Sequence, residues 1–257
     1  MPELMTWRLL PSDRIAPADF DADNYSTDNL SFWTPLLIEL GGISPGQRVL
    51  DIGCATGGFA IALAKQTGAH VIGCDLSMSF LAFARMKSPD LVAWTAGDVQ
   101  NLPFNDGSFN CVVASLLLHQ VADRTRALTE GFRVLRSSGA MVIRTILPED
   151  IAMRIPFRFF PALAQQQEAV MPSLGELTDR AHAVGFERIH VRRVCRDKGL
   201  YLDEVEGSFR REAACRYRFL TQQDLDEGVQ RMRADWQRAG HRWIDPRPTH
   251  FIVAGKP

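Results

Sequence analysis

The chain has 257 residues, is 46% hydrophobic and 23% charged, and carries a net charge of −1, which is typical of a globular protein. This near-neutral charge gives no general attraction for nucleic acid, and no stretch approaches the roughly 20 apolar residues of a membrane span. No signal peptide is recognisable, and five cysteines without a CxxC spacing indicate neither a disulfide framework nor a zinc site. We therefore expect a cytoplasmic protein without a metal, membrane or nucleic-acid partner. Its oligomeric state is not predicted.

The first half of the chain alternates between strands and helices. The first 30 residues are polar and rich in turn formers, and a helix is predicted over 30–40, closed by two glycines. Apolar strands that alternate with helices predict a parallel sheet with right-handed crossovers, which binds ligands at the carboxyl ends of its strands. The predicted strands are 48–52, 70–74, 91–95, 110–115 and 140–146, and the predicted helices are 58–66, 77–86 and 123–135.

The second half interrupts this alternation. Residues 147–172 include an aromatic, proline-containing stretch that is too long for a plain loop, so we expect a lid or an inserted helical piece. The sequence Ser173-Leu-Gly-Glu176 has the pattern of a capping box, and the helix that it opens should end at Gly185. Two further strands are predicted at 189–194 and 249–254, with a largely helical insert at about 200–245 between them.

The most informative stretch is Val49-Leu-Asp-Ile-Gly-Cys-Ala-Thr-Gly-Gly58, a strand that ends in an acid and is followed by a glycine turn and a helix. Glycines let a ligand approach the backbone closely, and the helix N–H groups face the turn. The spacing Gly53-x-Ala55-x-x-Gly58 also fits a dinucleotide fingerprint. However, Asp51 would repel a pyrophosphate and suits a cationic cofactor such as S-adenosylmethionine. An ordinary strand–turn–helix junction is the alternative interpretation.

Four further features lie where a nucleoside cofactor needs them. Asp75 ends the second strand, 22 residues after Gly53, where a carboxylate can accept hydrogen bonds from both ribose hydroxyls. Asp98 follows the third strand and could accept from the adenine amino group. Two turns lead into the fourth and fifth strands, Leu102-Pro-Phe-Asn-Asp-Gly-Ser-Phe109 and Val134-Leu-Arg-Ser-Ser-Gly139.

Together these motifs resemble the class I S-adenosylmethionine-dependent methyltransferases, in particular the small-molecule branch that includes quinone- and biotin-pathway enzymes. The resemblance covers about 45–145 and rests on Asp51-x-Gly53-x-Ala55-x-Gly57, Asp75-x-Ser77 with Leu81 and Ala84, Gly97-Asp98 and the two turns. It implies an α/β, Rossmann-like sheet of seven mostly parallel strands with an antiparallel last strand at 249–254, helices on both faces, and a lid or insert. Ala55 and Ser138 depart from the usual residues, without threatening cofactor binding.

The resemblance also implies a domain layout and a binding site. A helical segment at 1–44 would cover the cofactor site of a methyltransferase domain at 45–257. Asp51 and Gly53 would hold the methionine moiety, Asp75 the ribose, and Asp98 with Val99 the adenine edge. The full expected set of cofactor-binding residues is Tyr25, Asp51, Gly53, Cys54, Ala55, Gly57, Asp75, Leu76, Gly97, Asp98, Val99 and Ser115.

The expected chemistry is in-line transfer of a methyl group to an O, N or C nucleophile, in secondary or cofactor metabolism. His119, just past the fourth strand, is the candidate general base, because its ordinary pKa is about 6.5; a structural histidine is the alternative. Phe157 and Phe160 would line the substrate pocket with His119, or form the packing face of the lid. Tyr25 would close over the cofactor or anchor the N-terminal segment.

Two other functions stay open. One is an enzyme of the same fold that uses S-adenosylmethionine for other chemistry, such as attack within the cofactor. The other is a nicotinamide oxidoreductase, supported only by the dinucleotide-like spacing. The sequence does not predict the substrate or the acceptor atom.

Overall fold

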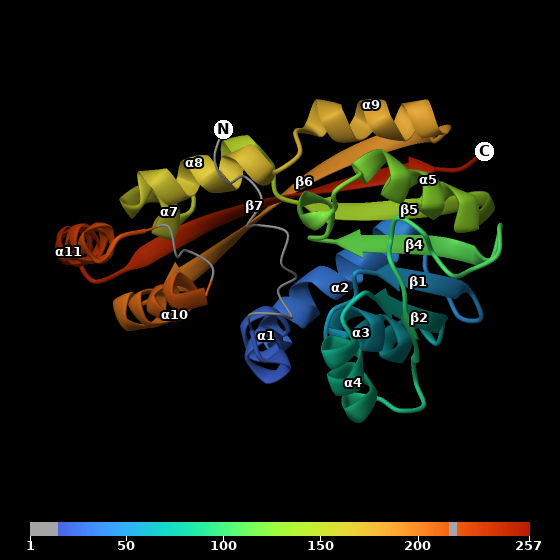
Figure 1. Ribbon diagram of the computed structural model, residues 1–257, viewed down its shortest axis with the longest axis horizontal. Coiled ribbons are helices and arrows are strands. Elements are labelled where there is room, and N and C mark those ends of the chain that lie inside the picture. Colours follow the sequence, from blue (N-terminus) through green and yellow to red (C-terminus); the bar gives the residue numbers. More distant parts are fainter. Residues whose placement is uncertain (1–14, 216–219) are drawn as a thin grey trace. The chain divides into compact units, whose positions relative to one another are not determined.

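The computed structural model describes residues 15–215 and 220–257 (Figure 1). The strands are β1 Arg48–Ile52, β2 His70–Asp75, β3 Ala93–Ala96, β4 Phe109–Ser115, β5 Leu135–Thr145, β6 Glu187–Leu200 and β7 Trp243–Gly255. The helices are α1 Pro17–Asn24, α2 Thr27–Gly41, α3 Gly58–Thr67, α4 Met78–Lys87, α5 Arg124–Val134, α6 Pro148–Ile151, α7 Ile155–Phe159, α8 Pro161–Val170, α9 Leu174–Val184, α10 Leu202–Cys215 and α11 Gln222–Arg238, with a short 3-10 turn, η3, at Leu118–Gln120.

The described strands form one seven-stranded sheet in the order β3-β2-β1-β4-β5-β7-β6. Strands β1 to β5 pair in parallel. The end of β7 is antiparallel to the start of β5: the Lys256 amide donates to the Gly139 carbonyl at 2.8 Å, and the Lys256 carbonyl accepts from the Ser138 amide at 3.1 Å. The predicted Rossmann-like sheet with an antiparallel last strand is confirmed.

By internal contacts the chain divides into two compact units. Unit 1 is the described part of Met1–Thr145 together with Leu174–Arg192 and Phe251–Pro257, and unit 2 is Ile146–Ser173 with Arg193–His250. Strands β6 and β7 each contribute residues to both units. Among the described residues, no helix is both long and apolar enough to cross a membrane.

The core of unit 1 lies between the sheet and helices on both of its faces (Figure 1). Side chains two residues apart on a strand share a face, so Leu50 and Ile52 pack with the buried residues of α5 and α9, such as Leu128 and Leu177. The opposite face of β4 and β5 contacts α2. The near-continuous apolar runs in β1 and β4 follow from this burial on both faces.

Unit 2 has its own apolar cluster. Phe160 and Phe209 stack with ring centroids 3.9 Å apart, and Met232 and Trp243 belong to the same cluster. The segments predicted as a lid, 147–172, and as a helical insert, about 200–245, both contribute residues to this unit. The division into a 1–44 cover and a 45–257 domain stays a prediction.

Several element boundaries differ from the predictions. A helical segment was predicted within 1–44, but its only helix was placed at 30–40; the polar start also contains helix α1, which has no buried residue and therefore no apolar stripe to reveal it. Helix α2 begins three residues early, because Ser26 caps it by accepting from the Asn29 amide at 3.2 Å. Strands β6 and β7 are longer than expected. Much of β6 is exposed and polar, so the sequence shows no apolar pattern there that would predict a strand.

The expected helix end and glycine turn at 134–139 is also wrong in detail. Helix α5 ends at Val134 and β5 starts at Leu135, with a register shift against β4 before the regular pairing begins at Ala140. Ser138, and not Gly139, takes the left-handed backbone conformation, with φ +63°. The irregular start of the strand replaces the expected turn.

Candidate functional site

The glycine turn after β1 is fastened to the end of β2. The amides of Gly53 and Cys54 both donate to the Cys74 carbonyl, at 2.8 and 3.1 Å. The Ala55 amide donates to Oδ2 of Asp75 at 2.8 Å. Gly53 has φ +65°, a conformation that glycine adopts without steric cost. Most of the turn's N–H groups are therefore bonded inside the protein, and the turn is held rigidly beside Asp75.

Three side chains cover the turn so closely that a Cβ added at any of three glycines would force the side chain above it to move. An added Cβ would lie 2.5 Å from Leu117 at Gly53, 2.2 Å from Trp94 at Gly57 and 2.2 Å from Tyr25 at Gly58. The Tyr25 hydroxyl also donates to the Cys54 carbonyl at 3.3 Å. Trp94 and Leu117 were not predicted to belong to this site, because each comes from an apolar segment where its residue type is ordinary.

Helix α1 is tied to the turn through one carboxylate. Asp21 accepts from the Thr56 hydroxyl at 2.7 Å and pairs with the Lys87 ammonium of α4 at 2.5 Å. This attachment places Tyr25, at the end of α1, over the start of α3. Its burial, with Asp51 as the next cause, raises the pKa of the Tyr25 hydroxyl well above its ordinary value.

Carboxylates stand at or just after the ends of β1, β2 and β3. Asp51 is 2% exposed, and burial, with a smaller effect of Asp75, raises the pKa of Asp51 to about 8. Burial also raises the pKa of Asp75, against the opposing effect of amide hydrogen bonds, including one from Ser77 at 2.8 Å. Asp98 accepts from the Gln100 amide at 2.9 Å. The negative charges of Asp51 and Asp75 are thus poorly solvated, and a cationic ligand would relieve that cost.

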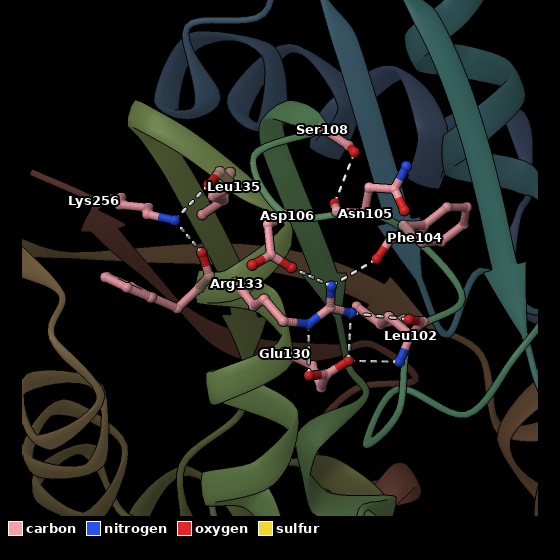
Figure 2. Close-up of polar contacts among 10 residues, drawn as sticks. Leu102, Phe104, Asn105, Asp106, Ser108, Glu130, Arg133, Leu135 and Lys256 are labelled. Carbon is pink, nitrogen blue, oxygen red and sulfur yellow. Dashed lines mark hydrogen bonds and ion pairs between the residues drawn. The ribbon is translucent and has the colours of Figure 1, made fainter.

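The loop that follows the third of these acids is fixed by helix α5 (Figure 2). The Leu102 amide donates to Glu130, which is 3% exposed, at 2.8 Å. Arg133 donates to the Leu102 and Phe104 carbonyls at 2.9 and 2.6 Å and pairs with Glu130 and Asp106. The hydrogen bond from Arg133 lowers the pKa of Glu130. The predicted turn before β4 is therefore held by an ionic network that is centred on the buried Glu130.

The ends of β4 and β5 add polar groups to the same edge of the sheet. Arg144 Nη1 donates to the Ser115 hydroxyl at 3.1 Å, and the guanidinium carbon lies 4.3 Å from the centre of the Trp33 ring. His119 lies in η3, half-buried, with Nε2 3.3 Å from the Gln120 side-chain amide. Sequence reasoning missed Arg144; a single basic residue inside an apolar strand was the available signal.

Comparison with known proteins agrees with this geometry. Residues 50–143 match the family described as "Methyltransferase domain". A demethylmenaquinone methyltransferase of Beutenbergia cavernae is 39% identical over 111 residues, which are 43% of this chain and 45% of that protein. The chain spans about half the length of the first curated relatives that it matches, 45% and 55% of two demethylmenaquinone methyltransferases. This central part is therefore similar to the methyltransferase domains of that family.

Solved structures that are similar to this chain have the same fold. A putative methyltransferase from an antibiotic biosynthesis pathway of Anabaena variabilis superposes with a TM-score of 0.71 at 23% identity, covering 86% of this chain and 96% of that one. The 4+2 cyclase SpnF superposes with a TM-score of 0.58 at 19% identity, covering 88% and 80%. At these identities the structures share the fold and nothing more is concluded from them.

S-adenosylmethionine is the methyl donor of the matched family, and the residues present fit it. The acids at the strand ends suit a cofactor that carries an ammonium and a sulfonium. The two oxygens of Asp75 accept from the Ala55 and Ser77 amides, and a carboxylate has about four acceptor sites, so it can also accept from a ribose hydroxyl. Leu76 is 52% exposed, which leaves an apolar side chain open next to Asp75. A dinucleotide would bring its pyrophosphate toward the same acids, so the donor set disfavours it.

The remaining residues predicted for the candidate site are distributed as follows. Gly97 lies under Pro103, with an added Cβ 2.8 Å from the proline ring, and Val99 is 8% exposed. Phe157 and Phe160 lie in unit 2, where Phe160 is 2% exposed and packs against Phe209. Their contacts are those of a packing face, and a role in binding substrate stays a prediction. The individual cofactor contacts are likewise predictions.

Proposed function

We propose that this protein is an S-adenosylmethionine-dependent methyltransferase that acts on a small molecule. The observation that carries the proposal is the group of carboxylates around the glycine turn, above all Asp51, whose pKa is raised to about 8 by burial and by Asp75. A buried carboxylate that is costly to ionise gains a favourable partner when a cationic group binds beside it. The matched family at 50–143 supports the same cofactor.

Each acid has a separate task in this proposal. Asp51, at the end of β1, faces the ammonium of the methionine moiety. Asp75 accepts from the ribose hydroxyls while it holds the turn through Ala55. Asp98, anchored by Gln100, accepts from the adenine amino group. When bound, the cofactor supplies an electrophilic methyl group on sulfur, so the protein's contribution is to orient the two reactants and to exclude water.

The acceptor side is proposed at the ends of β4 and β5. His119 follows β4 in η3 and is the candidate to take a proton from an acceptor that is not yet ionised. The similarity to a demethylmenaquinone methyltransferase supports a small-molecule acceptor in cofactor or secondary metabolism. Because a cyclase shares the fold, the fold alone does not distinguish methyl transfer from other chemistry.

The test is to incubate the purified protein with methyl-labelled S-adenosylmethionine and fractionated small-molecule extracts. We expect equal amounts of S-adenosylhomocysteine and of a labelled product. Consumption of the cofactor without a labelled product would overturn methyl transfer. A parallel titration should show binding of S-adenosylhomocysteine and none of NAD; the reverse preference would overturn the cofactor assignment.

A further inference from the structure

The side chain of Gln100 joins two parts of the candidate site. Gln100 is half-buried in the loop after β3, two residues beyond Asp98. Its side-chain Nε2 donates to both carboxylate oxygens of Asp98, at 3.2 and 3.3 Å. Its side-chain Oε1 accepts from the backbone amide of Asp123 at 2.9 Å. One amide group therefore links the acid that follows β3 to the residue that caps the start of helix α5.

Glutamine is chemically matched to both of these contacts. An ionised Asp98 carboxylate only accepts hydrogen bonds, and the Asp123 amide only donates. The Gln100 amide group has a donor end and an acceptor end, and turning it over would place oxygen against oxygen and N–H against N–H. Glutamate at this position would set a second carboxylate against Asp98, and methionine would replace neither contact. The residue type at position 100 therefore decides whether the Asp98 carboxylate is held.

The backbone around Gln100 is itself anchored to helix α5. The Gln100 amide donates to Oδ1 of Asp98 at 2.9 Å, and the Gln100 carbonyl accepts from Nε of Arg126 at 3.0 Å. The Asp123 side chain accepts from the Arg126 amide at 3.0 Å, which caps the helix. Two residues beyond Gln100, the Leu102 amide is bonded to the buried side chain of Glu130. These contacts fix the plane of the Asp98 carboxylate relative to α5.

We propose that Gln100 is a positioning residue that makes the site selective for adenine, because it orients the Asp98 carboxylate to accept from the amino group of the cofactor's ring. This inference rests on the proposed function, which assigns Asp98 to adenine. A carboxylate has about four acceptor sites, so Asp98 can accept from a ligand while it is held by Gln100. A purine with an oxo group at the same position would set an acceptor against this carboxylate and be disfavoured.

The experiment compares S-adenosylhomocysteine with S-inosylhomocysteine, in which the 6-amino group of the purine is replaced by an oxo group. Their dissociation constants are measured by calorimetric titration of the parent protein and of Gln100→Met, which keeps the length of the side chain and removes its donor and its acceptor. We expect the parent to bind the 6-amino ligand at least about tenfold more tightly, the order of one hydrogen bond to a charged acceptor. Gln100→Met should reduce this preference by at least about threefold.

The ratio of the two affinities separates a positioning role from a structural one. A site that is merely loosened would bind both ligands more weakly and keep their ratio. Gln66→Met, at an exposed position near the end of α3, is the matched control and should keep the parent's preference. Because Gln100 is proposed to act through Asp98, adding Gln100→Met to Asp98→Ala should change the preference no further than Asp98→Ala alone.

The inference is overturned by equal binding of the two ligands to the parent, by a preference that Gln100→Met leaves intact, by an equal loss in Gln66→Met, or by a further loss when Gln100→Met is added to Asp98→Ala. If Gln100→Met does not fold, Gln100→Glu at pH 8 decides. It keeps an acceptor for the Asp123 amide and faces Asp98 with a like charge, so a reduced preference supports the inference and an unchanged one refutes it. A parent that binds neither ligand would refute the proposed function itself, whereas a parent that binds both equally refutes only the inference.

Discussion

Replacing Asp75 by asparagine tests the site at its most connected residue. Asp75 accepts from the Ala55 and Ser77 amides, both at 2.8 Å, so it fastens the glycine turn and begins helix α4. A hydrogen bond to a charged acceptor contributes about 1.5–3 kcal/mol. Asparagine keeps one acceptor oxygen and turns an NH2 group toward the second amide, so one bond is lost and the other is weakened.

An opposing effect reduces this loss. Burial raises the pKa of Asp75, which means that its charge is itself costly in the folded protein. Removing the charge recovers part of the loss, and we expect the free energy of unfolding to fall by about 2 kcal/mol, which leaves a typical domain folded. If the ribose also bonds to Asp75, affinity for S-adenosylhomocysteine should fall by a further tenfold or more.

Denaturant unfolding measures the first effect of Asp75→Asn and calorimetric titration of the folded variant measures the second. Asp90→Asn, at an exposed position in the turn before β3, is the matched control and should change neither quantity. An Asp75→Asn protein as stable as the parent would refute the structural assignment of the two amides. A normal affinity in a destabilised protein would refute the ribose contact.

Three further predictions address other parts of the site. Because the pKa of Asp51 is raised to about 8, the folded state keeps a proton that the unfolded chain releases. This residue should therefore lower the free energy of unfolding by up to about 1.4 kcal/mol for each unit of pH between pH 4 and 8. Asp51→Asn should flatten this pH dependence in denaturant unfolding, and an equally steep slope in the variant would contradict the prediction. Gly53→Ala should weaken cofactor binding in a titration, because the added Cβ displaces the Leu117 side chain from 2.5 Å and strains the backbone at φ +65°. Gly46→Ala, with φ +77° and open space around it, should keep the parent's affinity. Parent-like affinity in both variants would place the cofactor elsewhere. His119→Ala should lower turnover of a protonated acceptor by about 10²–10⁴-fold without changing cofactor affinity; turnover within a few-fold of the parent would make His119 structural.

The sequence was sufficient for the part of the fold whose physical signals are local. Apolar runs such as Val49 to Ile52 are buried on both faces and predict their strands directly. The acids at 51, 75 and 98 were predictable as strand-end groups, because strand ends could be located from the glycines and turns that follow them. The position of Asp75 beside the glycine turn follows from the parallel pairing of β1 with β2.

The rest depends on contacts between distant segments. The position of helix α1 within the predicted helical segment was missed because the helix has no buried residue, although Asp21 ties it to Thr56. The contacts of Arg144 depend on Trp33, which lies 111 positions earlier in the chain and meets it only after folding. A tryptophan in an apolar helix predicts burial and gives no indication of the charge that it covers.

The reactivity of the buried cysteine in the glycine turn, Cys54, can be used to measure how often this turn opens. Cys54 is 1% exposed, and burial raises the pKa of its thiol well above the ordinary value. Burial likewise raises the pKa of Cys74 and Cys111 to about 12, whereas Cys195 is exposed. Since thiol reagents attack the thiolate, Cys195 should be alkylated first among these four, and Cys54 only while the turn is transiently open. The alkylation rate of Cys54 therefore measures how often the turn opens, and a ligand that rests on the turn would protect this thiol in proportion to its occupancy.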